Sequence, residues 1–209
     1  MRPLLRGVLH QAAFVVACVV GALLVLFAAR GRAVGAAVFA SSAVVMLGTS
    51  ALYHRITWGP RARLVMRRLD HAGIYLLIAG TYTPVGLISL HGLLQKVVLW
   101  TVWVGAGAAV LVKVVWVAAP RWLAVVFALA LGWVGVAALP QLAERAGVGA
   151  VILLAAGGVA YSLGAIVYAR RRPDPVPRVF GYHELFHALT LAALGCHYAA
   201  ISFFVVRVA

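Results

Sequence analysis

The sequence predicts an all-α fold: a polytopic membrane protein whose seven transmembrane helices form one bundle, with the N-terminus in the cytoplasm. Of its 209 residues, 65% are hydrophobic and only 11% are charged, whereas a soluble domain is about 45–50% apolar. Long apolar runs recur along the chain, and none shows the alternation of barrel strands. The connections between the runs are too short for a soluble domain, so residues 1–209 are expected to form a single membrane domain.

Seven apolar segments follow one another, each near the length of about 20 residues that a helix needs to cross a bilayer. They are expected at residues 8–29, 34–53, 72–90, 97–117, 122–139, 149–169 and 184–206. The first follows Arg2 and Arg6, as in a signal peptide, but it is too long for one and is expected to remain as an uncleaved helix. Pro84 is expected to kink the third helix beside the polar residues 81–83.

The distribution of basic residues predicts the orientation. Thirteen of them fall on one side of the expected helices, namely Arg2, Arg6, Arg55, Arg61, Arg63, Arg67, Arg68, Lys113, Arg121, Arg170, Arg171, Arg172 and Arg178. Five fall on the other side, namely Arg30, Arg32, Lys96, Arg145 and Arg207. The positive-inside rule therefore places the first group and the N-terminus in the cytoplasm.

The net charge of +14 limits the classes of partner. The sequence contains no nucleic-acid-binding motif, and its arginines lie between apolar runs. The expected partners are therefore membrane lipids, with anionic headgroups on the cytoplasmic side, and not nucleic acids.

Two histidines, His183 and His187, open the last apolar segment. They are four residues apart and therefore share one face of a helix. Ionisable groups at membrane depth are costly and usually functional. The predicted orientation brings this helix end to the same side as His54 and Asp70, where the second helix ends and the third begins. Three neutral imidazoles suit zinc and leave a fourth position for water.

Ser50 and Asp70 complete the predicted site, in which His54, His183 and His187 are the metal ligands. Ser50 lies one helical turn before His54, so its hydroxyl could orient that ring or the bound water. Asp70 could hydrogen bond this water and accept its proton, which makes both residues candidates for catalysis. In simpler interpretations, Ser50 is a small packing residue and Asp70 is a helix cap.

These residues also carry a resemblance to a known family. The sequence contains Ser50-x3-His54, then Arg68-Leu69-Asp70-His71-Ala72 leading to Ile78-Ala79-Gly80-Thr81-Tyr82-Thr83-Pro84, and finally Gly181-Tyr182-His183-Glu184-Leu185-Phe186-His187. With these motifs in this order, the chain resembles the hemolysin III family, the bacterial branch of the progestin and adipoQ receptor superfamily. The resemblance covers essentially the whole chain and implies a multi-pass protein of the bacterial inner membrane.

The resemblance implies a zinc ion on three histidines, which match His54, His183 and His187, with a serine and an aspartate that match Ser50 and Asp70. The superfamily also includes enzymes similar to alkaline ceramidases, which implies hydrolysis of a lipid amide. The family name implies a haemolytic, pore-forming activity instead, so the two implied activities conflict.

A metalloprotease is an alternative interpretation, because residues 183–187 also spell H-E-x-x-H, with Glu184 as the general base. The rest of the chain argues against it. No acidic residue follows His187, and Ala193 occupies the position where one protease class places its third histidine.

The remaining histidines are expected outside this cluster. His10 and His91 lie near membrane ends, where they are expected to meet the interface. His71 is expected to pack or to meet headgroups. His197 lies ten residues beyond His187, about 15 Å along a helix, too far to share its metal, and is expected to be a buried, hydrogen-bonded side chain.

Three function classes remain open. The first is a zinc-dependent hydrolase of a lipid amide or ester, whose substrate carries an acyl chain. The second is a pore or cytolysin. The third is a regulator of membrane state whose metal is structural.

Overall fold

The computed structural model describes residues 3–116 and 118–206, and their regular secondary structure is helical apart from one isolated β-bridge. Its helices are α1 Val8–Leu26, α2 Ala33–Arg55, α3 Pro60–Pro84, α4 Gly92–Val115, α5 Arg121–Gly132, α6 Leu139–Ala146, α7 Val148–Arg170 and α8 Tyr182–Ala200. Short π-helices extend α3 and α8, as η1 (Val85–Ser89) and η3 (Ile201–Val206), and the 3-10 helix η2 (Trp133–Ala138) joins α5 to α6.

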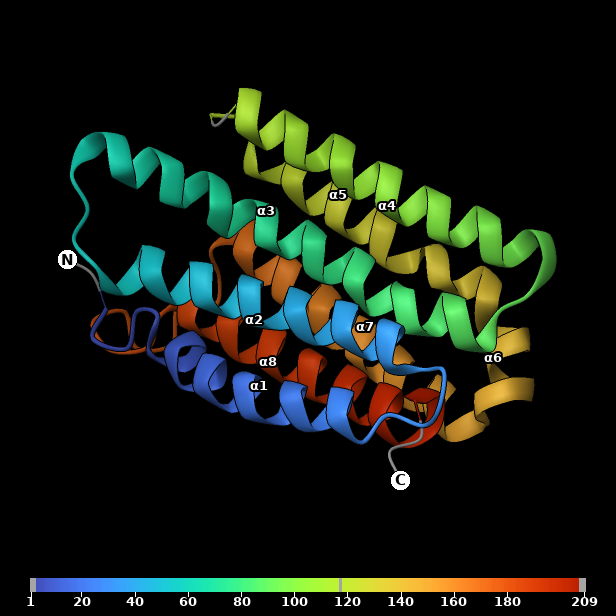
Figure 1. Ribbon diagram of the computed structural model, residues 1–209. Coiled ribbons are helices and arrows are strands. Elements are labelled where there is room, and N and C mark those ends of the chain that lie inside the picture. The colour runs from blue at the N-terminus through green and yellow to red at the C-terminus, as the bar shows by residue number, and fades with distance from the viewer. Residues whose placement is uncertain (1–2, 117, 207–209) are drawn as a thin grey trace.

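Seven of the described helical stretches are long and apolar enough to cross a membrane, which confirms the predicted seven-helix bundle. Among neighbouring helices, α1 packs against α2, α2 against α3 and α7 against α8. The axes of the long helices are roughly aligned, and the chain reverses direction from one to the next (Figure 1). Large apolar side chains such as Trp100 and Phe203 remain exposed, as expected of surfaces that face lipid. Arg2, Arg207 and the expected fourth-segment end at Val117 lie outside the described residues.

The expected start of the third helix at residue 72 is wrong. The helix α3 begins at Pro60, a residue well suited to the first turn of a helix. Its first ten residues include four arginines and are mostly exposed. A search for apolar runs finds the membrane-crossing part of a helix and misses a polar extension of this kind.

The irregularity predicted at Pro84 is present, because the α-helical hydrogen bonding of α3 ends there and the π-helix η1 follows. The hydroxyls of Thr81 and Thr83 donate to the carbonyls of Leu77 and Ala79 within α3. The expected end of the fifth segment at residue 139 is wrong. That membrane crossing continues through η2 and α6 to Ala146.

Close packing of α2 on α3 depends on glycine. A Cβ atom at Gly80 would lie 2.1 Å from the Ser42 hydroxyl oxygen, and one at Gly73 would lie 3.1 Å from the Cα atom of Met46. These contacts bring the two backbones together along one face of α3. The packing places the last turns of α2 directly beside the first half of α3, where the candidate site lies.

Candidate metal centre

The predicted site residues come together at the end of the bundle that carries the N-terminus (Figure 1). His54 lies in the last turn of α2, and His183 and His187 lie in the first turns of α8. Asp70 lies on α3, ten residues after its start at Pro60. The packing of antiparallel helices therefore unites groups that are 129 residues apart in the chain.

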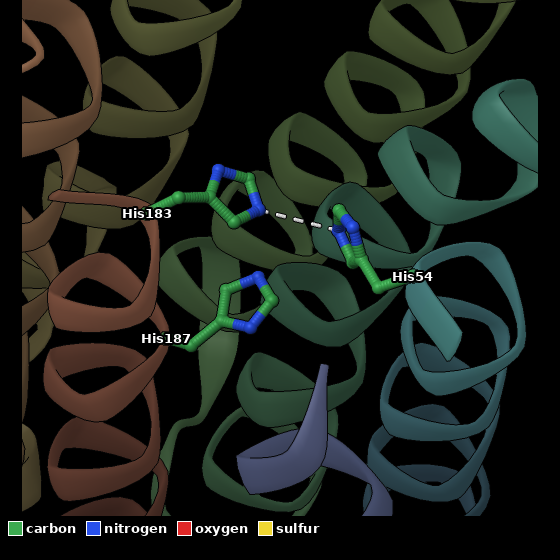
Figure 2. A group of neighbouring side chains, drawn as sticks. All are labelled: His54, His183 and His187. Carbon is green, nitrogen blue, oxygen red and sulfur yellow. Dashed lines mark hydrogen bonds between the residues drawn. The ribbon is translucent and has the colours of Figure 1, made fainter. Parts of the chain in front are cut away.

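The three histidines present their ring nitrogens to one another. The Nε2 atoms of His54 and His183 are 3.2 Å apart, and one ligand nitrogen from each of the three rings lies within 4.8 Å of the others. Figure 2 shows His183 and His187 projecting from successive turns of α8 toward His54 on α2. His187 is buried, and the other two are half-buried. This cluster could hold a metal ion.

The chemistry of this donor set fits zinc. Zinc bound by imidazole has nitrogen ligands at about 2.0–2.1 Å, which places neighbouring ligands of a tetrahedron about 3.4 Å apart. The distance of 3.2 Å between His54 Nε2 and His183 Nε2 is close to that value. The two nitrogens lie within hydrogen-bonding distance of each other, and a shared cation would instead bind the lone pair of each.

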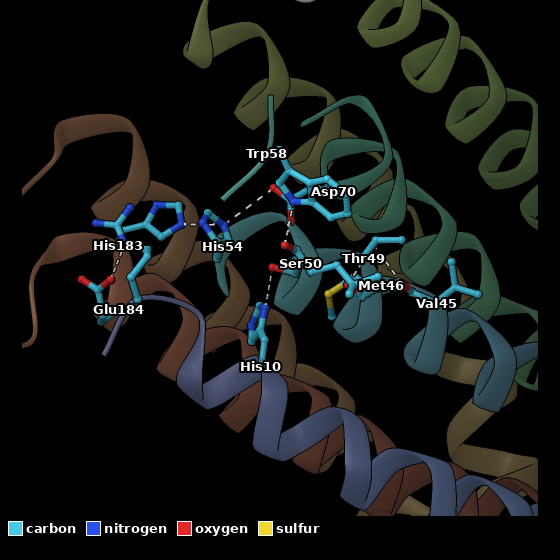
Figure 3. A network of polar contacts seen from close by, with 12 residues as sticks. His10, Val45, Met46, Thr49, Ser50, His54, Trp58, Asp70, His183 and Glu184 are labelled. Atoms are coloured by element: carbon cyan, nitrogen blue, oxygen red, sulfur yellow. Dashed lines mark hydrogen bonds and ion pairs between the residues drawn. The ribbon is translucent and has the colours of Figure 1, made fainter. Parts of the chain in front are cut away.

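Asp70 stands next to this cluster. Its Oδ2 atom is 3.8 Å from His54 Nε2 (Figure 3), and the Ser50 side chain lies near enough to interact with its carboxyl group. The simpler interpretation of Asp70 as a helix cap is wrong, because this residue lies inside α3. Ser50 is buried on α2, one turn before His54, with its hydroxyl among the polar groups of the site.

His10 is a site residue that sequence reasoning missed. We expected it at the membrane interface, but it is only 2% exposed. Its Nδ1 atom is 2.8 Å from the Ser50 hydroxyl oxygen, and its ring stacks on His187 with centroids 3.8 Å apart and planes 6° from parallel. A signal was present, since the predicted topology places His10 on the same side of the membrane as the other histidines.

The N-terminal segment passes over the site. Gly7 has a φ of 77°, and a Cβ atom there would lie 2.7 Å from the Cβ of His54, so only glycine fits without movement. The backbone N–H groups of Leu4 and Leu5 donate to the loop that precedes α8, at Arg178 and Val179. The start of the chain is thereby attached to the helix that bears the histidine pair.

Glu184 has a structural role and not that of a protease base. Its carboxylate is buried, forms an ion pair with Arg6 and accepts a hydrogen bond of 3.0 Å from the backbone N–H of Gly181 at the start of α8. It lies apart from the ring nitrogens of His54 and His183 in Figure 3. These contacts stabilise the first turn of α8 and argue further against the metalloprotease interpretation.

A cavity of about 120 Å³ adjoins the cluster and is lined by His10, Ser50, His54, Asp70, His183 and His187 together with residues of α3, α4, α5 and α7. A second, mostly apolar cavity of about 200 Å³ lies beside it and extends along α8 to His197. The two share six lining residues, namely Met46, Ile74, Ala128, Ala165, Phe186 and Thr190. His197 is half-buried and not buried, but it is hydrogen bonded as expected, with Nε2 3.2 Å from the carbonyl oxygen of Leu154.

Comparisons with known proteins agree with this architecture. The family described as Haemolysin-III related matches residues 1–198. The Hemolysin-3 homolog of Bacillus subtilis is 32% identical over 88% of this chain and 85% of its own length. Hemolysin-3 of Bacillus cereus is 32% identical over 77% of this chain and 70% of its own length. The adiponectin receptor protein of Drosophila melanogaster is 28% identical over 78% of this chain and 41% of its own length.

Proposed function

Because this chain belongs to the Haemolysin-III related family of multi-pass membrane proteins, we propose that it is a zinc-dependent hydrolase of a lipid amide or ester. The observation that carries the proposal is the meeting of three imidazoles from α2 and α8 beside a carboxylate from α3. Three nitrogen ligands with an open fourth position are typical of catalytic zinc sites, and a neighbouring carboxylate is a suitable proton acceptor.

In this proposal His54, His183 and His187 hold the zinc ion. When bound, zinc polarises a substrate carbonyl and lowers the pKa of a coordinated water to about 7. The burial of His187 and the stacking of His10 on its ring support a fixed orientation for that ligand. Ligands held in fixed orientations would keep a bound ion in one position beside the cavity.

Asp70 accepts the proton of the attacking water and returns it to the leaving amine or alcohol. The proximity of its Oδ2 atom to His54 Nε2, at 3.8 Å, supports this role. Ser50 helps to position the Asp70 carboxyl group, which lies beside it, and its own hydroxyl is oriented by His10. Ser50 therefore contributes by positioning, with a smaller effect than the loss of Asp70.

The shape of the interior supports a lipid substrate. The cavity beside the histidines shares six lining residues with the apolar cavity along α8, whose far end at His197 lies about 15 Å from His187. An acyl chain is the kind of group that such a cavity would accept within a membrane. A soluble peptide would leave its polar backbone groups unsatisfied there.

The test is product release from membrane lipid extracts, measured by mass spectrometry with purified protein. We expect a zinc-dependent hydrolysis product from wild type, and a decrease of about 10²- to 10⁴-fold with Asp70→Asn, whose amide cannot accept the proton. Glu144→Gln makes a similar change at an exposed site on α6 and should leave turnover unchanged. The absence of any zinc-dependent product from every lipid class would contradict the proposal and favour a regulator with a structural metal.

A second candidate function is suggested by the names of two relatives, which are called Hemolysin-3 homolog and Hemolysin-3. A conducting pore needs a polar path through the bilayer, whereas the second cavity is mostly apolar. We therefore rank a cytolysin below the hydrolase. Sustained ion conductance of liposomes containing purified protein, unchanged by Asp70→Asn, would reverse this order.

A further inference from the structure

A group of basic side chains lines the wall of the metal-site cavity that α3, α4 and α5 contribute. Its members are Arg67 on α3, Lys113 on α4 and Arg121 at the start of α5, and we refer to these three as the cationic wall. The ring of His71 lines the same cavity, and the charges of all three residues are near enough to act on it electrostatically. None of these residues has a role in the proposed hydrolysis.

Lys113 is the most informative of the three, because it is only 4% exposed. A cation in the last turns of a helix interacts favourably with the helix dipole, but that interaction does not require burial. Lysine is almost never fully buried unless it is paired. The described part of the chain contains no carboxylate in an ion pair with Lys113, and the charged group that acts on it is Arg67, which is also positive.

The cavity contains little negative charge to balance the positive charges of the cationic wall. Among the described residues that line it, Asp70 is the one carboxylate, and that group contacts Ser50 and faces His54. Arg121 lies over the ring of Tyr168, with its guanidinium carbon 5.5 Å from the ring centroid, an attraction that leaves its positive charge in place. Like charges in a partly buried setting repel each other, so an anion placed among them would lower the free energy of all three.

The identity of the groups points to phosphate. Guanidinium groups match phosphate oxygens with paired hydrogen bonds, and an ammonium group adds a compact charge. Arg121 also opens α5, whose first backbone N–H groups favour an anion. Because Arg121 is exposed and Lys113 is buried, the cationic wall leads from the surface of the bundle into the cavity.

We propose that Arg67, Lys113 and Arg121 bind the phosphate of an anionic lipid headgroup at the entrance of the metal-site cavity. The source is a lipid and not free phosphate, because a mostly apolar cavity that shares six lining residues with this one lies beside it along α8. This inference rests on the proposed function, which supplies the bond that is hydrolysed. It identifies the substrate of that reaction as a phosphate-bearing lipid. Binding of the headgroup itself requires no turnover.

The experiment is native mass spectrometry of the purified protein with phosphatidic acid or with diacylglycerol of identical acyl chains. We expect the protein to retain phosphatidic acid preferentially. Loss of one charged contact should weaken this retention about tenfold, so we expect that effect from Lys113→Gln. Arg121→Gln alters an exposed side chain and provides a second test that does not disturb the interior.

Lys96→Gln is the matched control, because it makes the same change on the same helix, about 25 Å away at the opposite end of α4. Equal weakening by Lys96→Gln and Lys113→Gln, or equal retention of phosphatidic acid and diacylglycerol by wild type, would overturn the proposal. Displacement of the lipid by millimolar inorganic phosphate would overturn the assignment to a lipid.

The two proposals fail in different ways. A protein that retains phosphatidic acid through Lys113 but releases no product from any lipid contradicts the hydrolase and supports the headgroup site. A protein that hydrolyses neutral lipids, and whose retention of phosphatidic acid is unaffected by Lys113→Gln and Arg121→Gln, contradicts the headgroup site and supports the hydrolase.

Discussion

At the scale of single residues, His10 connects two parts of the candidate metal centre that belong to different helices. Its ring stacks on His187 of α8, while its Nδ1 atom meets the hydroxyl of Ser50 on α2. Groups that orient metal ligands in this way commonly change metal affinity by 10- to 100-fold when they are removed. His10 is therefore expected to be a positioning residue for the site and not a ligand.

Replacement of His10 is expected to weaken zinc binding without abolishing it. His10→Ala removes both the stacking and the hydrogen bond, and we expect the dissociation constant for zinc to rise about tenfold. His10→Phe keeps an aromatic ring against His187, so its effect should be smaller. Zinc titration of the purified variants measures this, with His91→Ala, an exposed histidine outside the site, as the control. Equal zinc affinity in wild type and in all three variants would show that His10 does not support the site.

The sequence was sufficient to bring His54, His183 and His187 together with Asp70, because helix periodicity and the positive-inside rule place all four at one end of the bundle. The same reasoning places His10 at this end but could not assign it to the site, because no polar residue lies one turn away on its own helix. Its partners lie on α2 and α8, and contacts between helices depend on rotations that a single sequence does not specify.

At the scale of helices, the distance between α2 and α3 controls the distance between His54 and Asp70. Gly80 permits the close approach, since a Cβ atom at this position would lie 2.1 Å from the Ser42 hydroxyl oxygen. Gly107 on α4 provides a contrast, because a Cβ atom there would meet no other atom within 4 Å. The two glycines lie inside helices but differ in what surrounds them.

Alanine at these two glycines is therefore expected to have opposite effects on thermal stability. Gly→Ala within a helix is favourable by about 1 kcal/mol from helix propensity alone, so Gly107→Ala should keep or raise the unfolding temperature. At Gly80 the added methyl group overpacks the interface, which typically costs about 1–3 kcal/mol, so Gly80→Ala should lower it. Thermal unfolding in detergent compares them, and an unchanged or raised unfolding temperature for Gly80→Ala would contradict the packing argument.

The helix boundaries show what hydrophobicity can and cannot predict. The apolar segments located all seven membrane crossings. They missed the first ten residues of α3, because a helix rich in arginine that extends from the membrane has no apolar signal. They also missed the continuation of the fifth crossing through α6, an amphipathic helix with Pro140 in its first turn.

At the scale of the whole molecule, the metal centre is predicted to lie near the cytoplasmic side. This rests on the thirteen basic residues of one face against five on the other. A reporter that is active only outside the cytoplasm should work when it is fused after Ala209 and should fail when it is fused after Arg172. The reverse pattern would place the histidines and the cationic wall on the external side, away from the anionic inner leaflet.

The most direct test of the account is the zinc content of the purified protein. We expect about one zinc per chain in wild type and most of it lost in His187→Ala, with the fold of the variant checked separately because metal binding also supports folding. His197→Ala is the matched control, a histidine ten residues along the same helix that hydrogen bonds to Leu154 and not to the cluster, and it should keep its zinc. Zinc content that is negligible in wild type, or equal in wild type and folded His187→Ala, would contradict the claim that these histidines form a zinc site.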